Sequence, residues 1–173
     1  LLLNTGASKW NDPKNFKWTM AGLPLYPTEA RILAKHVIAA KPNAKVGILY
    51  QNDDFGRDFL GPFKKVLADA GGTAKVIMEQ SYDLTEPTVD SQLINLSKSG
   101  ADVFYNISTG KASSQSIRKV AELGWKPLRV LGEAARIEGH PDNVAASVLG
   151  SMVATAMDGA GLARAVRIEL HEK

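Results

Sequence analysis

Short apolar stretches alternate with amphipathic segments along most of the chain, and this alternation limits the possible fold more than any other feature. Five apolar, β-rich stretches lie at residues 45–50, 74–80, 102–107, 127–132 and 151–157. Apolar residues at helical spacing occupy residues 28–40, 58–70, 89–98 and 112–123. The strands are apolar throughout, which is typical of parallel strands buried on both faces. The pattern therefore predicts an α/β fold, a three-layer sandwich with a parallel sheet.

The composition fits a globular protein and argues against several other classes. The chain has 173 residues, which suits one domain of ordinary size, and 45% of them are hydrophobic. Its net charge of +3 comes from basic residues spread among acidic ones, which argues against nucleic acid as a partner. There is no cysteine, and no run of apolar residues is long enough to predict a membrane span. The three histidines lack metal-ligand spacing, so neither a metal nor a cofactor is predicted.

The first strand ends in the polar stretch "NDDFG", which is open to two interpretations. Asp53 and Asp54 would fit the acidic pair of a phosphoacceptor domain that binds Mg²⁺, but such a domain needs an aspartate where this chain reads "YNIST". Alternatively, one of the two aspartates caps the following helix and interacts favourably with its dipole. We favour the cap. Pro62, inside the predicted helix, should delay or kink that helix.

The loops that follow the strands offer groups suited to binding a solute. In an open parallel sheet, ligands bind beyond the carboxyl ends of the strands. Those ends here are residues 53–56, 106–109 and 132–134, which supply an aromatic ring, small hydroxyls, backbone amides and a carboxylate. The set contains no evident pair of nucleophile and base, so it favours binding of a small polar or amphipathic solute over catalysis.

Several longer motifs resemble one known family. They read "NTGASKWNDPKNFKWTM", "YPTEAR", "ILYQNDDFGRDFL", "SYDLTEPTVDSQLINLSKSGADVFYN" and "AELGWKP". They are similar to the branched-chain amino acid class of ABC-transporter solute-binding receptors, the leucine/isoleucine/valine-binding proteins, over about residues 1–131. The resemblance implies the type I periplasmic-binding fold, in which two α/β lobes close around a solute by hinge motion.

By this resemblance, the chain corresponds to the carboxyl-terminal lobe. Residues 1–15 would be the end of an amino-terminal-lobe strand and a crossing between lobes, residues 16–157 the carboxyl-terminal lobe, and residues 158–173 a divergent tail. We expect a fragment, because residues 1–3 resemble the end of a strand that begins before the printed sequence. One lobe alone should bind a solute weakly, because affinity comes from enclosure by both lobes.

The resemblance also implies solute-binding residues in the amino-terminal loop and after the first strand of the lobe. The loop at Gly6, Ala7 and Ser8 would contact the head of the solute through backbone groups and a hydroxyl. Phe55, an aromatic residue directly before a glycine, would close over the solute.

Further binding residues are implied after the third and fourth strands. Ser108, with Thr109 beside it, would contact the solute where amino acid binders often have a tyrosine. The glutamate that pairs with the solute ammonium in such binders aligns with Ala134, one residue after Glu133. Either Glu133 takes this role or the ammonium partner is missing, and an aromatic or aliphatic carboxylate then becomes a candidate solute.

The function implied is that of the periplasmic solute-binding component of an ABC importer. Its partners would be a small amino acid or carboxylate and an ABC permease in the membrane, and it would have no catalytic activity. Two alternatives remain open. One is a stand-alone α/β enzyme or phosphoacceptor domain, and the other is a lobe that binds no solute and associates as a homodimer.

Overall fold

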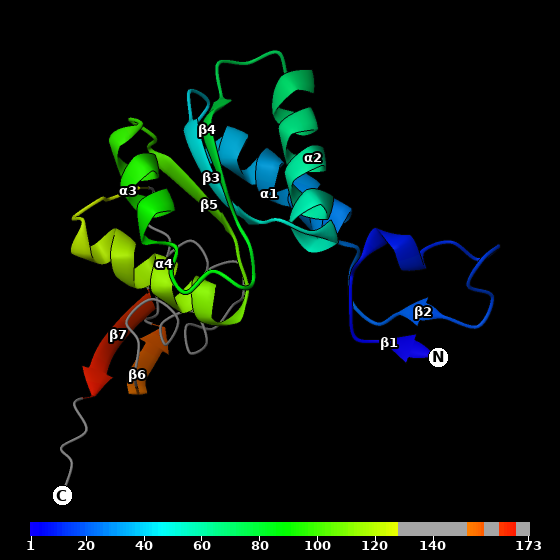
Figure 1. The fold of residues 1–173 in the computed structure, drawn as a ribbon. Coiled ribbons are helices and arrows are strands. Elements are labelled where there is room, and N and C mark those ends of the chain that lie inside the picture. The colour runs from blue at the N-terminus through cyan, green and yellow to red at the C-terminus, as the bar shows by residue number, and fades with distance from the viewer. Residues whose placement is uncertain (128–151, 158–162, 169–173) are drawn as a thin grey trace, which may run out of the picture.

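A three-stranded parallel sheet is the centre of the computed structural model, which describes residues 1–127, 152–157 and 163–168 (Figure 1). The strands are β3 (Lys45–Gln51), β4 (Lys75–Tyr82) and β5 (Val103–Ile107), and they lie in the order β4-β3-β5. The first three predicted strands are thus confirmed to within two residues. From residue 128 on, the predicted strand at 127–132 lies outside the described residues.

Two pairs of helices cover the two faces of this sheet. Helices α1 (Tyr26–Ala40) and α2 (Asp54–Asp69) pack on one face, and α3 (Asp90–Lys98) and α4 (Gly110–Glu122) pack on the other (Figure 1). This confirms the predicted three-layer α/β sandwich. Within residues 1–127, 152–157 and 163–168, none of the helices has the length and apolar character needed to cross a membrane.

The central strand sends alternate side chains into the two layers. Val46 and Ile48 of β3 are fully buried against α1 and α2, together with Phe63. Leu49 is equally buried on the opposite face, against Leu93 and its neighbours on α3. Burial of each such side chain stabilises the fold by roughly 1.5–3 kcal/mol. Two apolar clusters therefore pack on opposite faces of the sheet and fix the position of its carboxyl edge.

Helix α2 begins earlier than the sequence predicted. It starts at Asp54 instead of residue 58, so the expected delay by Pro62 is wrong. The reason is the cap, because the Asp53 carboxylate accepts a hydrogen bond from the backbone N–H of Gly56 at 3.1 Å. Pro62 removes one helical hydrogen bond, but Phe59 and Phe63 on either side of it are buried and hold the helix to the sheet.

The ends of the chain form two smaller sheets. Near the amino terminus, β1 (Leu2–Leu3) pairs in parallel with β2 (Met20–Ala21), and a short 3-10 helix, η1 (Ser8–Trp10), lies between them in sequence. Near the carboxyl terminus, β6 (Met152–Met157) pairs with β7 (Ala163–Ile168).

The pairing of β6 corrects one expectation. A strand does occur at the predicted residues 151–157, but it is antiparallel to β7 and forms a separate two-stranded sheet with it. The physical reason is the short connection between residues 157 and 163, because parallel neighbours need a crossover of about a dozen residues or more.

The amino-terminal edge of the main sheet is held by one carboxylate. Asp102 accepts a hydrogen bond from the Lys45 backbone N–H at 2.8 Å. It also forms an ion pair with Lys41, whose Nζ lies 3.0 Å from the carboxylate. Burial acts to raise the pKa of Asp102, but the hydrogen bond from Lys45 and the charge of Lys41 outweigh it and bring the pKa below its ordinary value of 3.8.

We predict that Asp102→Ala lowers the free energy of unfolding by about 1 kcal/mol at neutral pH, because the Lys45 N–H loses its partner. A lowered pKa means that this stabilisation is complete above the unfolded-state pKa and is lost as the pH falls below about 4. Urea denaturation of both proteins between pH ~3 and 7 measures the effect. Asp69→Ala is the control, because the ion pair of Asp69 is an exposed one, with Lys65 on the same helix. An equal loss in the control, or a difference that does not shrink in acid, would contradict the prediction.

Candidate functional site

An open hollow of about 620 Å³ lies between the amino-terminal segment and the first turn of α2. We call it the rim pocket, because it lies beyond the carboxyl end of β3. The residues that line it are Leu3, Asn4, Thr5, Ala7, Lys9, Trp10, Tyr26, Asp53, Asp54, Phe55 and Arg57. This is the edge of the sheet at which the sequence predicted a solute site.

An aromatic cluster forms the apolar wall of the rim pocket. Tyr26, at the start of α1, meets Phe55 edge-to-face at a centroid distance of 5.2 Å and stacks on Phe59 at 5.0 Å. Phe55 and Phe59 also meet edge-to-face at 5.2 Å. Such pairs contribute about 0.5–1.5 kcal/mol each beyond the area they bury. The cluster therefore fixes Phe55 as a firm surface within the pocket.

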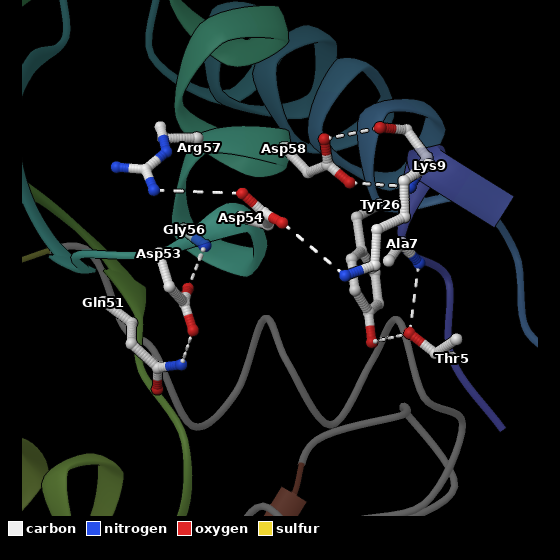
Figure 2. Close-up of polar contacts among 11 residues, drawn as sticks. Thr5, Ala7, Lys9, Tyr26, Gln51, Asp53, Asp54, Gly56, Arg57 and Asp58 are labelled. Carbon is white, nitrogen blue, oxygen red and sulfur yellow. Dashed lines mark hydrogen bonds and ion pairs between the residues drawn. The ribbon is translucent and has the colours of Figure 1, made fainter. Parts of the chain in front are cut away.

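The amino-terminal loop is docked on this cluster through Gly6. The Gly6 carbonyl accepts a hydrogen bond from the Tyr26 backbone N–H at 2.8 Å. A Cβ atom at residue 6 would lie 2.1 Å from the Pro24 carbonyl oxygen, so only glycine allows this approach. Thr5 Oγ1 accepts from the Ala7 N–H at 3.1 Å and lies 3.2 Å from the Tyr26 hydroxyl (Figure 2). These contacts hold Ala7 at the pocket surface.

Charged side chains close the pocket on its polar side. Ser8 donates its backbone N–H to Asp58 Oδ2 and its hydroxyl to Asp58 Oδ1, both at 2.7 Å. Asp54 lies between Lys9 Nζ, at 3.6 Å, and Arg57 Nη2, at 3.8 Å (Figure 2). Lys9, Asp54 and Arg57 are all exposed. Their ion pairs therefore add little stability, and each can be replaced by a pair with another ion.

A buried hydrogen-bond network supports the pocket from behind. Gln51, only 5% exposed at the end of β3, accepts hydrogen bonds at Oε1 from the Tyr82 hydroxyl at 2.9 Å and from Thr109 Oγ1 at 2.6 Å. Its Nε2 donates to Asp53 Oδ2 at 2.5 Å (Figure 2). The other Asp53 oxygen caps α2 at Gly56, where a Cβ atom would lie 1.8 Å from the Gln51 carbonyl oxygen. One amide thus connects the ends of all three strands with the start of α2.

This network tests the cap interpretation of "NDDFG". The prediction that one aspartate caps the helix is confirmed for Asp53, whose two carboxylate oxygens are both hydrogen-bonded. In the part of the chain that the structure describes, no three residues among His, Cys, Asp and Glu are grouped so as to hold a metal ion. Both carboxylate oxygens of Asp53 are occupied, one by the cap at Gly56 and the other by Gln51.

The predicted site residues fall into three groups. Ala7 and Phe55 line the rim pocket, Gly6 is buried behind it, and exposed Ser8 lies beside it against Asp58. The second group, at the end of β5, consists of Ser108 and Thr109, which do not line the pocket. Glu133 and Ala134 lie outside the described residues. Binding of solute by any of these residues stays a prediction.

Ser108 and Thr109, at the end of β5, form hydrogen bonds with other residues of the protein. Ser108 donates its hydroxyl to Asn106 Oδ1 at 2.7 Å. Thr109 donates its backbone N–H to the Tyr82 hydroxyl at 3.1 Å, in addition to its bond with Gln51. Thr109 is thus connected to the pocket wall through Gln51 and Asp53.

The sequence did not point to seven of the pocket residues as solute contacts. They are Leu3, Asn4, Thr5, Lys9, Trp10, Tyr26 and Arg57. They come from the amino-terminal segment and from the starts of α1 and α2, and no local pattern links these segments. Long-range contacts bring these segments together, among them Gly6–Tyr26 and the Ser8–Asp58 contact that spans 50 positions, and such contacts are not visible in the sequence.

The chain belongs to the periplasmic binding protein family. The family model described as "Periplasmic binding protein" matches residues 1–164. This match confirms the resemblance to periplasmic binding proteins that the sequence motifs indicated.

Curated relatives match about half of the chain. Over 87 residues it is 44% identical to "Homoserine kinase" of Solibacter usitatus, a match that covers 50% of this chain and 29% of that protein. Over 88 residues it is 28% identical to "Leu/Ile/Val-binding protein homolog 8" of Brucella abortus, covering 51% of this chain and 21% of that protein. The chain therefore matches less than a third of the length of each of these relatives.

Solved structures share the fold. An amino acid ABC transporter substrate-binding protein from Pseudomonas fluorescens Pf-5 superposes with a TM-score of 0.63 at 22% identity, covering 71% of this chain and 33% of that one. An R. palustris ABC-transporter solute-binding protein in complex with benzoate gives a TM-score of 0.62 at 16% identity, covering 72% and 34%. At these identities the likeness shows the fold alone.

We predict that Gln51→Leu lowers the free energy of unfolding by about 2–3 kcal/mol, because it leaves the buried Tyr82 hydroxyl and the Thr109 hydroxyl without their acceptor. Tyr82→Phe should cost less, about 1 kcal/mol, because Gln51 Oε1 keeps the Thr109 hydroxyl as a donor, and the Thr109 N–H that loses the Tyr82 oxygen belongs to an exposed residue. Denaturant unfolding of the two single variants and the double variant measures their coupling. Strict additivity of the two losses would show that the network does not act as a unit.

Proposed function

We propose that this chain forms one wall of the solute-binding cleft of a periplasmic solute-binding protein that serves an ABC importer. The rim pocket is the proposed place of the solute, which it would hold without chemical change. The observation that carries this proposal is the combination of an aromatic wall and exchangeable charges in one hollow at the carboxyl edge of a parallel sheet. Membership of the periplasmic binding protein family supports it.

The chemistry of the pocket favours a small carboxylate or amino acid as solute. Trp10, Tyr26 and Phe55 offer apolar faces for an aliphatic or aromatic body. Lys9 and Arg57 offer positive charge for a carboxylate, and Asp54 offers negative charge for an ammonium group. The names of the similar proteins, Leu/Ile/Val-binding and benzoate-bound, make L-leucine and benzoate the two probes of choice.

The remaining walls of the cleft and the transport partner belong to the same proposal. The chain spans about a third of the length of the solved relatives, so a second lobe would enclose the solute from the other side. The assembled protein would act in the periplasm and deliver the solute to an ABC permease. A homodimer of this lobe, formed through the pocket face, is the alternative, and sedimentation analysis would reveal it.

The homoserine kinase match defines a second candidate function that can be tested directly. An enzyme of that name transfers the γ-phosphoryl group of ATP to the hydroxyl oxygen of homoserine, with ADP as leaving group and loss of the hydroxyl proton. If the 44% identity reflects shared activity, the chain should form ADP and phosphohomoserine from ATP, Mg²⁺ and L-homoserine. We expect no turnover above the rate without protein, and ³¹P NMR with time is the measurement. Formation of a phosphate ester would overturn the proposal that the chain is not an enzyme.

The binding proposal is tested by NMR titration of the ¹⁵N-labelled chain with L-leucine and with benzoate up to roughly 20 mM, which detects Kd values in the millimolar range. Amide signals of residues 5–9 and 53–57 should shift with at least one probe. Phe55→Ala should weaken that binding at least about fivefold, because the aromatic wall is lost.

The matched control is Ile32→Ala, which removes an exposed apolar side chain from α1 outside the pocket and should leave the Kd unchanged. Shifts that spread evenly over the surface, or equal weakening by the two variants, would refute the rim pocket as the solute site. The absence of any shift with either probe would count against the proposed function itself.

A further inference from the structure

We propose that Asp58 is a specificity-determining residue that competes with the carboxylate group of a solute for the two hydrogen-bond donors of Ser8. This inference rests on the proposed function, because it concerns a solute held in the rim pocket. Its consequence is that the protein binds a carboxylate solute more weakly than the Ser8 donors alone would allow, because the solute must first displace Asp58.

The contact between Ser8 and Asp58 is itself a carboxylate-binding geometry. The two donors of Ser8 each bind a different oxygen of the Asp58 carboxylate, and both distances are 2.7 Å. Charge-assisted bonds of this length are among the stronger hydrogen bonds in proteins. The structure therefore contains a site for a carboxylate, and its occupant is a side chain of the same protein.

This carboxylate site borders the rim pocket. Ala7 and Lys9, on either side of Ser8, both line the pocket, as do Phe55 and Arg57 just before Asp58 on α2. Ser8 is exposed and Asp58 is half-buried, so both are accessible to solvent beside these lining residues, although neither lines the hollow itself. Figure 2 shows Asp58 facing the Lys9 segment with Asp54 beside it. A solute carboxylate in the pocket lies within reach of the Ser8 donors once Asp58 withdraws.

Electrostatic repulsion opposes the presence of both the Asp58 carboxylate and a solute carboxylate at the Ser8 donors. Asp54 and Asp58 are one helical turn apart, and like charges at this spacing repel each other. In the free protein, Lys9 and Arg57 balance Asp54 while the Ser8 donors balance Asp58. A solute carboxylate would add a third negative charge beside them unless Asp58 gave up its place. Rotation of the half-buried Asp58 side chain toward water is the movement that admits the solute.

The test is a benzoate titration followed by NMR on the ¹⁵N-labelled chain and four variants. Asp58→Ala should bind benzoate about tenfold more tightly than the unmodified chain, because the internal competitor is gone. Adding Ser8→Ala to Asp58→Ala should reverse most of this gain, because the donors are then lost. Asp58→Asn, which keeps the shape and one acceptor oxygen, should fall between the unmodified chain and Asp58→Ala.

Asp69→Ala is the charge-matched control. It removes one negative charge from the same helix at the opposite end, where Asp69 pairs with Lys65, and should leave the benzoate Kd within about twofold. Benzyl alcohol is the matched neutral probe, and Asp58→Ala should change its Kd by less than about twofold. The Ser8 amide signal gives an independent readout, since it should move upfield in free Asp58→Ala and return downfield when benzoate binds.

The possible outcomes separate this inference from the proposed function. If benzoate shifts the pocket signals but Asp58→Ala binds it no more tightly, the competition is refuted while the pocket stands. An equal gain from Asp69→Ala would also refute it, because the effect would then be one of net charge. If neither benzoate nor L-leucine shifts the pocket signals of any variant, the proposed function fails and the competition fails with it.

Discussion

The rim pocket depends on the amide of Gln51. This buried side chain is bonded at once to Tyr82 at the end of β4, to Thr109 after β5 and to Asp53 at the start of α2. A buried amide that satisfies three partners fixes their positions relative to one another, and removal of it leaves several polar groups unpaired together. Because Asp53 in turn caps α2, the direction in which the first turn of that helix presents Asp54 and Phe55 follows from the same amide.

The opposite wall of the pocket is attached in a different way. The amino-terminal loop reaches the lobe through backbone contacts at Gly6 and through the surface contacts of Ser8 and Lys9. Exposed ion pairs such as Lys9–Asp54 contribute about 0–1 kcal/mol, far less than the buried apolar clusters under the sheet. The lobe side of the pocket is therefore the firm surface, and the loop side is the one whose contacts a solute can replace at low cost. A binding site needs this difference, because a solute must gain contacts without breaking the core.

The sequence predicted the parts of this structure that depend on periodicity. The strands at β3, β4 and β5 and the layered arrangement follow from apolar runs and helical stripes, which report burial directly. The early start of α2 was missed because the cap at Asp53 and the packing of Phe59 outweigh the local effect of Pro62. The antiparallel β6–β7 pair was missed because an apolar run indicates a strand but not its partner.

The site was predicted only in part for the same reason, since Lys9 and Arg57 carry no local pattern and meet only through tertiary contacts.

The distribution of polar contacts favours a binding role over a catalytic one. The polar groups beneath the pocket, Gln51 and Asp53 with their partners, bind one another and act as scaffold. The charged groups at the surface of the pocket, Lys9, Asp54 and Arg57, are exposed and form weak ion pairs. In the proposed function, charged groups of a solute would replace the present partners in these pairs. A catalytic site needs a nucleophile or base held poised toward the reacting atom, whereas a binding site needs donors whose present partners are replaceable. Ser8 holds a carboxylate that belongs to the protein, and under the competition proposed above a solute of the same chemistry would displace it, which is the second condition.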